Sequence, residues 1–349
     1  MAFFGFPDKI IRLLKALYSK SLSSVRVNGE LTDWFATKVG VRQGCIISPL
    51  LFNILLELVM LYATHDTTIG AHIQGQLVSN LRFADDIAII AESETDLQTL
   101  VNRVHQYSTN LGLKINIAKT EVQVISRRDI DIKINISNAD LKQVEHFVYL
   151  GGKISKKGTC TEDIQLRIGK ALGAMQNLNE ILNSKEISRP TKMELYSTLI
   201  MSILLYGSET WTLKKEDENR LLVFEMTCLR KILGITKLDK IRNTTIRQTL
   251  GLKHTIIEKI SIKRLRYYGH VQRMNPQRYP KVAIVGTVNG ERPRGRPAKR
   301  WMDGIRSDCN ILCLTSLSEA SRKAQDRNEW RIILQRMASL NQVGVDAKN

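Results

Sequence analysis

Two adjacent carboxylates, Asp85 and Asp86, lie between two short apolar runs, and this pattern limits what the segment from Leu81 to Ile90 can form. It predicts two short strands joined by a hairpin, with the carboxylates at its tip. Two like charges held together repel each other unless a cation or a basic partner neutralises them. Hard cations such as Mg²⁺ bind carboxylate oxygens and phosphate oxygens together, as nucleotidyl transfer requires. The pair therefore predicts a metal site, and a solvated acidic turn is the alternative.

A second motif lies about forty residues earlier, between Val39 and Asn53. Gly44 has no side chain to obstruct a sugar or a base, and the Gln43 amide can hydrogen-bond to either. Ser48 is expected to be the N-cap of a helix whose first position is Pro49. Taken alone, the motif is also typical of an ordinary loop before a core helix.

Together, this loop and the run Phe83-Ala84-Asp85-Asp86 resemble the reverse transcriptases of non-LTR (LINE-type) retrotransposons. Residues 112–121 are similar to the next palm motif of that family, and residues 146–154 to the strand and turn at the base of its thumb. The order and spacing of these elements match. Residues 265–274 and 294–301 resemble the tail of many such elements, so the resemblance covers nearly the whole chain.

The resemblance implies an RNA-directed DNA polymerase that takes deoxynucleoside triphosphates, an RNA template and a DNA primer or target, with Mg²⁺ as cofactor. Asp85 and Asp86 would be catalytic metal ligands. Lys119 would lie near the leaving pyrophosphate, where a cation offsets charge or donates a proton, although a solvated lysine is equally consistent with the sequence. The positions implied to contact the nucleotide or the template are Arg42, Gln43, Gly44, Ser48, Pro49, Phe83 and Ala84.

One departure from the family affects the metal site. Such polymerases hold two metals with a further aspartate from an earlier palm strand. Before Gln43 the acids are Asp8, Glu30 and Asp33, and none follows an apolar strand in the family's way. We therefore expect a truncated reverse transcriptase without the fingers, the first catalytic carboxylate or an endonuclease domain, and without activity as an isolated chain. Whether the chain is an enzyme stays open, and a non-catalytic RNA- or DNA-binding protein is the alternative.

The expected fold class is α+β. Residues 1–155 are predicted to form a partial palm, an antiparallel sheet with helices on one face. Residues 156–262 have the apolar spacing of an all-helical, thumb-like domain. Residues 263–349 are predicted to be a basic helical tail, interrupted by a proline-rich linker at 275–298.

Local patterns support the palm assignment. Asn28-Gly29 predicts a hairpin turn, and Ser93 with Asp96 predicts the start of a helix. The alternation of apolar residues at 113, 115 and 117 predicts a strand.

Charge points to nucleic acid. The chain has a net charge of +18, and residues 263–300 hold 11 Lys and Arg against one acid. Such density predicts phosphate-backbone binding that weakens with salt. The basic residues expected to take part are Arg292, Arg294, Arg296, Lys299 and Arg300. Residues 293–297 also have the core pattern of an AT-hook, which fits a narrow A·T minor groove, and a flexible basic linker is the alternative.

The remaining composition favours an intracellular protein of the nucleus or cytoplasm. Five scattered cysteines do not form a disulfide framework. Cys309 and Cys313 have no histidine after them and are expected to be core thiols instead of zinc ligands. Asp8 and Lys9 argue against a signal peptide. Residues 46–63 are apolar, but their polar positions favour a buried helix over a membrane span, and no membrane partner is expected.

Overall fold

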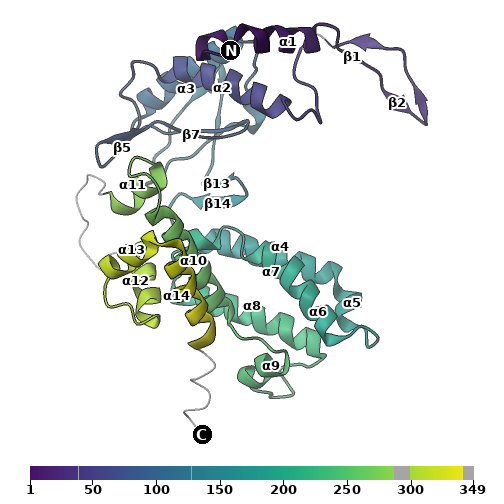
Figure 1. Cartoon of the computed structure of the whole chain (residues 1–349), viewed down its shortest axis with the longest axis vertical. Helices are drawn as coiled ribbons and strands as arrows, with labels where there is room; N and C mark the ends of the chain where they lie inside the picture. The colour runs from purple at the N-terminus through teal and green to yellow at the C-terminus, as the bar shows by residue number, and fades with distance from the viewer. Residues whose placement is uncertain (38, 127, 287–298, 341–349) are drawn as a thin grey trace. The chain divides into compact units, whose positions relative to one another are not determined.

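The computed structural model describes residues 1–37, 39–126, 128–286 and 299–340 of the chain (Figure 1). The chain divides into two compact units. Unit 1 comprises Met1–Ala71, Leu77–Thr120 and Lys133–Leu141, and unit 2 comprises His72–Gln76, Glu121–Ile132 and Lys142–Asn349. The described residues form helices and short, mostly antiparallel strands, which confirms the α+β class. The described strands are joined in two-stranded pairs, so the small antiparallel sheet that we expected is divided into separate pairs.

Unit 1 combines three α-helices with short hairpins. The helices are α1 (Asp8–Ser19), α2 (Ser48–Thr64) and α3 (Glu94–Asn110), with 3-10 turns at Ala2–Phe4 and Ile117–Lys119. The paired strands are β1 (Leu22–Ser23) with β4 (Phe35–Ala36), β2 (Arg26–Val27) with β3 (Glu30–Leu31), β7 (Asn80–Phe83) with β8 (Asp86–Ile89), and β10 (Asn135–Ile136) with β11 (Ala139–Asp140). Strands β5 (Ala71–Ile73) and β6 (Gln76–Val78) also pair, and residues His72–Gln76 of that hairpin are assigned to unit 2.

The core of unit 1 lies between α2 and α3. Met60, Ala63 and Val104 are buried there, and Ile87 and Ile89 of β8 pack against them. Strand β8 is thereby held against the two helices, which fixes the hairpin that carries the two carboxylates.

Local chemistry explains two elements that the sequence predicted correctly. The Asp96 backbone N–H donates to Ser93 Oγ at 3.1 Å, which caps α3. Asn28 and Gly29 turn the β2–β3 hairpin with φ of 52° and 95°, left-handed values that asparagine and glycine tolerate best.

Two local predictions in unit 1 were wrong. Residues 113–116 are not a strand, and the 3-10 turn Ile117–Lys119 follows them. Ser48 is not the N-cap of α2, because Ile47 holds that position and Ser48 is the first helical residue. Ser48 Oγ instead lies 3.1 Å from the Tyr18 hydroxyl, and Pro49 lies in the first turn one position later than expected.

Unit 2 is mainly helical (Figure 1). Its strands are β9 (Glu121–Val122), paired in parallel with β12 (Lys142–Gln143), and β13 (His146–Tyr149), paired antiparallel with β14 (Gly152–Ser155). Its helices are α4 (Thr161–Asn177), α5 (Asn179–Asn183), α6 (Arg189–Leu195), a π-helix (Tyr196–Ile200), α7 (Met201–Leu204), a 3-10 turn (Ser208–Thr210), α8 (Lys215–Leu233), α9 (Asn243–Thr249), α10 (Ile256–Gln272), α11 (Tyr279–Val285), α12 (Trp301–Ile311), α13 (Leu317–Gln325) and α14 (Arg327–Leu340).

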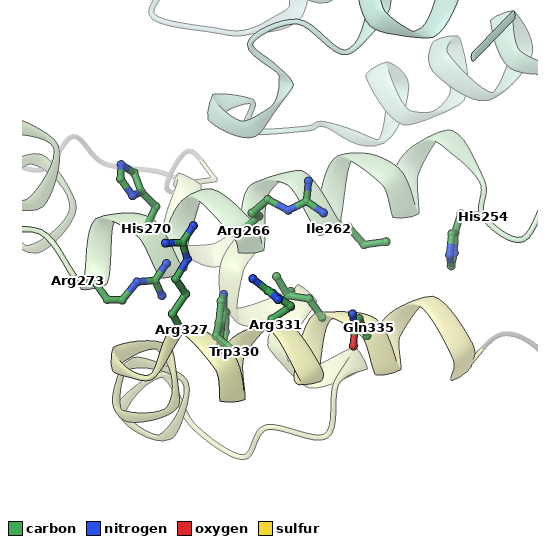
Figure 2. A pocket seen from close by; sticks show the side chains of 10 residues that line it. His254, Ile262, Arg266, His270, Arg273, Arg327, Trp330, Arg331 and Gln335 are labelled. Atoms are coloured by element: carbon green, nitrogen blue, oxygen red, sulfur yellow. The ribbon is translucent and has the colours of Figure 1, made fainter. Parts of the chain in front are cut away.

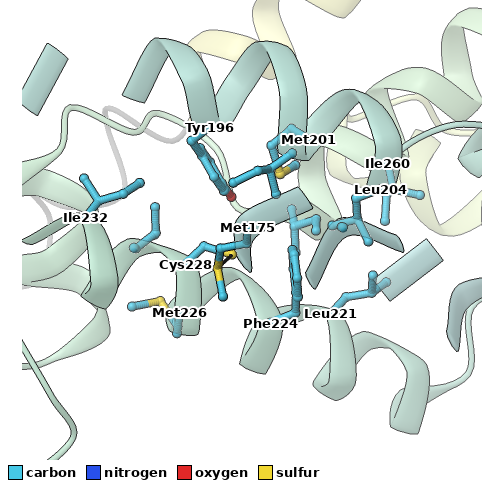
Figure 3. Close-up of a cluster of buried hydrophobic side chains, with 14 of the residues drawn as sticks. Met175, Tyr196, Met201, Leu204, Leu221, Phe224, Met226, Cys228, Ile232 and Ile260 are labelled. Carbon is cyan, nitrogen blue, oxygen red and sulfur yellow. Dashed lines mark hydrogen bonds between the residues drawn. The ribbon is translucent and has the colours of Figure 1, made fainter. Parts of the chain in front are cut away.

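Two hydrophobic cores hold unit 2 together. The first gathers residues of α4, α8 and the helices between them, with Tyr196 and Phe224 near its centre (Figure 3). The second lies among α10, α12, α13 and α14 around Trp330. Helix α10 supplies Ile256 and Ile260 to the first core and Leu265 and Tyr268 to the second.

The predicted linker at 275–298 is partly wrong. Helix α11 occupies Tyr279–Val285, with proline in its first turn, and residues 287–298 lie outside the described residues. The cysteine prediction is half right, because Cys309 is buried and Cys313 is exposed. None of the helices in the described residues has the length and apolar content needed to cross a membrane.

Candidate active site

The two adjacent carboxylates lie at the tip of the β7–β8 hairpin in unit 1. Phe83 pairs with Asp86, so Ala84 and Asp85 form a two-residue turn. Ala84 has φ 51°, a left-handed conformation that is uncommon for residues other than glycine. Such conformations concentrate at functional sites, where the surrounding structure over-determines the backbone. The turn leaves both carboxylates exposed to solvent.

The hairpin is fixed to α2 from both of its strands. Arg82 Nη1 of β7 donates to Glu57 Oε2 of α2 at 2.8 Å. Ile87 of β8 packs into the core below. The position of the carboxylates relative to α2 is therefore set by packing as well as by one ion pair.

A cavity of about 510 Å³ joins the hairpin tip to the loop before α2 and to the first turns of that helix. Seven predicted site residues line it: Arg42, Gln43, Gly44, Ser48, Pro49, Ala84 and Asp85. Two motifs that lie about forty residues apart in the sequence thus share one wall. Gly44 has φ 80°, so this part of the loop uses a conformation that favours glycine.

Arg42 has a structural role in this wall. Its Nε and Nη2 donate to Ser21 Oγ at 3.0 and 2.7 Å, and Nη2 also donates to the Leu17 carbonyl at 3.0 Å. The guanidinium therefore ties the loop to the end of α1. No local pattern indicated these partners, because they lie more than twenty residues upstream.

Four residues of the cavity wall were not predicted from the sequence: Val41, Cys45, Ile46 and Phe52. Hydrogen bonds from the Ile47 backbone and the Ser48 side chain lower the pKa of the Cys45 thiol. The position of Cys45 directly after Gly44 was the only signal that could have indicated it.

Comparison with known proteins identifies the family of the first 154 residues. Residues 1–154 match the family model described as reverse transcriptase (RNA-dependent DNA polymerase). These residues belong to the reverse transcriptase family. The resemblance to non-LTR retrotransposon enzymes is thereby confirmed.

The relatives of the chain are transposon proteins. A putative uncharacterised transposon-derived protein of Caenorhabditis elegans is 25% identical, over 76% of this chain and 98% of the relative. The probable RNA-directed DNA polymerase from transposon BS of Drosophila melanogaster is 26% identical, over 77% of this chain and 30% of the relative. The polymerase of the mobile element jockey from the same organism is 21% identical, over 66% of this chain and 25% of the relative. The chain thus spans less than a third of the length of these two polymerases.

Three predicted site residues do not line the cavity: Phe83, Asp86 and Lys119. Phe83 is 65% exposed beside the turn. Lys119 is exposed at the end of its 3-10 turn, where its backbone N–H donates to Asn116 Oδ1 at 3.2 Å. Its proposed role near the pyrophosphate stays a prediction.

Reverse transcriptases are generally metal-dependent polymerases. The paired carboxylates of Asp85 and Asp86 have the hard oxygen ligands that suit a divalent cation. Within the described residues, however, no three His, Cys, Asp or Glu side chains gather into a group that could hold a metal. The pair therefore matches the chemistry of such a cation and falls short of the number of ligands it needs.

The predicted basic residues of the tail fall in two classes. Arg292, Arg294 and Arg296 lie outside the described residues. Lys299 Nζ donates to the Leu213 carbonyl at 3.1 Å. This hydrogen bond holds the start of α12 against the segment that precedes α8. The Arg300 backbone N–H donates to Asp303 Oδ2 at 2.9 Å, which caps α12.

Proposed function

We propose that the chain provides the aspartate-bearing part of an RNA-directed DNA polymerase that adds deoxynucleotides to a primer on an RNA template. Residues 1–155 would act as a partial palm, residues 156–262 as a thumb, and residues 263–349 as a basic tail. The observation that carries the proposal is the shared cavity, in which Gln43 and Gly44 face the same space as Asp85.

The wall of the cavity suits a nucleotide. The Gln43 amide can donate to or accept from a base or a sugar, and Gly44 allows the backbone to approach closely. Asp85 and Asp86 would bind Mg²⁺, which prefers carboxylate and phosphate oxygens in an octahedral arrangement. Two carboxylates supply only part of that arrangement, so a further acid has to complete the site.

Metal binding by the carboxylate pair is the direct test. Free Mn²⁺, followed by electron paramagnetic resonance, should bind the purified chain weakly, and the D85N/D86N variant should lose that binding. Asp33→Asn is the matched control, since it removes an exposed carboxylate that lies outside the cavity wall. Equal Mn²⁺ binding by the wild type and D85N/D86N would contradict the assignment.

Primer extension on an RNA template separates a complete site from an incomplete one. With only two carboxylates in place, the purified chain is expected to incorporate no nucleotide in Mg²⁺. Incorporation that disappears in Asp85→Asn would show that another acid of the chain completes the site, and the predicted incompleteness would be wrong.

A second function, nucleic-acid binding without catalysis, is favoured by the distribution of charge. Unit 1 contains 12 Lys and Arg against 11 Asp and Glu, whereas unit 2 contains 40 against 23. Nearly all of the net positive charge therefore belongs to the helical unit. Such a unit attracts a phosphate backbone whether or not the carboxylates of unit 1 act.

A further inference from the structure

A groove of about 900 Å³ lies between α10 and α14 in unit 2 (Figure 2). Its walls carry Arg266, His270 and Arg273 from α10, and Arg327 and Arg331 from α14. Among the described residues, no aspartate or glutamate lines it. Figure 2 shows the arginine side chains of α14 reaching toward α10, with Arg327 beside Arg273.

The basic residues form two rows along the helices. Arg266 and His270 are four positions apart on α10, as are Arg327 and Arg331 on α14, so each pair lies on one face of its helix. Four residues advance a helix by about 6 Å, which is close to the separation of successive phosphates along an extended strand. The rows therefore suit a chain of phosphates better than a single one.

The charges of the groove lack anionic partners. In the described part of the chain, no carboxylate forms an ion pair with Arg266, Arg327 or Arg331. Arg273 donates to the Ala324 carbonyl at 2.6 Å, and burial and then the charge of Arg327 lower the pKa of its guanidinium. Like charges held together without an anion favour the binding of one.

Arg264, also on α10, shows the contrasting arrangement. It is buried, and its Nε and Nη2 donate to the two Asp308 carboxylate oxygens at 2.7 and 2.9 Å. The charge of Arg264 is therefore neutralised by Asp308 inside the fold. Arg266, Arg327 and Arg331 are exposed, and their guanidinium donors can reach a ligand. Arg273 is half-buried and uses one donor on the Ala324 carbonyl.

Trp330 forms part of the groove floor but is not free to stack on a base. It is 3% exposed, and its Nε1 donates to the Leu265 carbonyl at 3.0 Å. The available contacts are thus those of guanidinium groups with phosphate oxygens, which carry no information about base sequence.

We propose that the groove between α10 and α14 binds the phosphate backbone of a nucleic-acid strand without base preference. This inference rests on the proposed nucleic-acid function and adds the place at which the helical unit holds the strand. The planar guanidinium matches phosphate in a two-point hydrogen bond, and arginine is favoured over lysine where that geometry matters.

The test removes two charges from the groove and two from elsewhere. In R327Q/R331Q, affinity for a fluorescent single-stranded RNA or DNA oligonucleotide should fall roughly ten- to thirtyfold at 0.1 M salt, and the salt slope should flatten by about 1.4, because two phosphate contacts are lost. The matched control is R322Q/R336Q, which removes two exposed arginines of α13 and α14 that do not line the groove. The affinity of the control for the oligonucleotide should fall by no more than about threefold, because its two charges act on the strand only at long range. Unchanged circular dichroism spectra establish that both variants fold.

Equal weakening of the two variants would overturn the inference while leaving nucleic-acid binding by the chain intact. Failure of the wild type to bind any oligonucleotide would instead contradict the proposed function as well. A poly-glutamate peptide serves as the second ligand. If R327Q/R331Q loses the peptide and keeps the oligonucleotide, the groove belongs to an acidic protein partner and the inference is wrong.

Discussion

At position 269 of α10 there is room only for a hydrogen atom. An added Cβ would lie 2.3 Å from Trp330 Nε1 and 2.4 Å from Trp330 Cδ1, closer than real atoms approach. Because the ring is buried and hydrogen-bonded to α10, it cannot simply turn away. Gly269 therefore allows α14 to lie against α10 and brings the two arginine rows together.

Replacing this glycine should cost stability at the second core of unit 2. We expect Gly269→Ala to destabilise the protein by about 1–3 kcal/mol, since overpacking a filled core costs about that much. Thermal unfolding followed by circular dichroism would measure the change.

Gly173 of α4 provides the control for this substitution. Nothing lies within 4 Å of the Cβ that would be added there, so Gly173→Ala should raise stability by about 0.5–1 kcal/mol through helix propensity. A Gly269→Ala variant as stable as Gly173→Ala would show that Trp330 can move aside.

Single residues also show how far the sequence could predict the candidate active site. The meeting of Gln43 with Asp85 was anticipated because the motifs carried a family resemblance. The left-handed Ala84 and the ties of Arg42 to Ser21 were not, since they depend on tertiary contacts that no local pattern encodes. The α10–α14 groove was missed for the same reason, because Arg266 and Arg331 lie far apart in the sequence.

At the scale of elements, helix α13 begins with a cap that depends on ionisation. Glu319 accepts from the Thr315 backbone N–H at 2.9 Å, from its hydroxyl at 2.8 Å, and from Lys323 Nζ at 2.9 Å. The Lys323 interaction and then the Thr315 donors lower the pKa of Glu319 to about 2. The carboxylate form is thus favoured by folding.

The contribution of this cap should depend on pH with a defined sign. A carboxyl whose pKa is lowered by folding stabilises the protein above its unfolded pKa, about 4.3, and loses that effect as pH falls toward 2. Glu319→Gln should therefore lower the melting temperature at pH 7, and the difference from wild type should shrink between about pH 4.3 and 2. Melting curves across this range measure it.

Glu186→Gln is the control for the pH series, since it changes an exposed glutamate that lies outside α13. A difference in melting temperature between Glu319→Gln and wild type that stays constant from pH 7 to 2 would contradict this, because the cap would then not depend on the charge of Glu319.

Elements specified by local chemistry were predicted well. The Asn28-Gly29 turn and the Ser93 cap need only neighbouring residues, so their patterns suffice. Residues 113–117 alternate like a strand, yet no described strand pairs with them, and a strand without a partner leaves its backbone groups unsatisfied. In α11, Pro280 was taken as a linker residue, but proline is tolerated in the first turn of a helix.

For the whole molecule, the uneven charge predicts where nucleic acid is held. D85N/D86N should bind an oligonucleotide at least as well as wild type, because both carboxylates belong to the nearly neutral unit 1. For wild type, affinity for a single-stranded oligonucleotide should fall by about 300-fold between 50 and 200 mM salt if some six phosphate contacts form. Fluorescence anisotropy titrations would measure both quantities. A change in affinity below tenfold over that range would contradict an electrostatic mode of binding.

The position of α10 in two cores has a consequence for how unit 2 comes apart. A helix that buries its first turns in one core and its later turns in another cannot leave either without exposing apolar surface in both. Opening one core therefore also costs free energy in the other, and the two cores are coupled into a single cooperative unit. The thumb-like helices and the tail helices, assigned to separate domains by sequence alone, would then melt together.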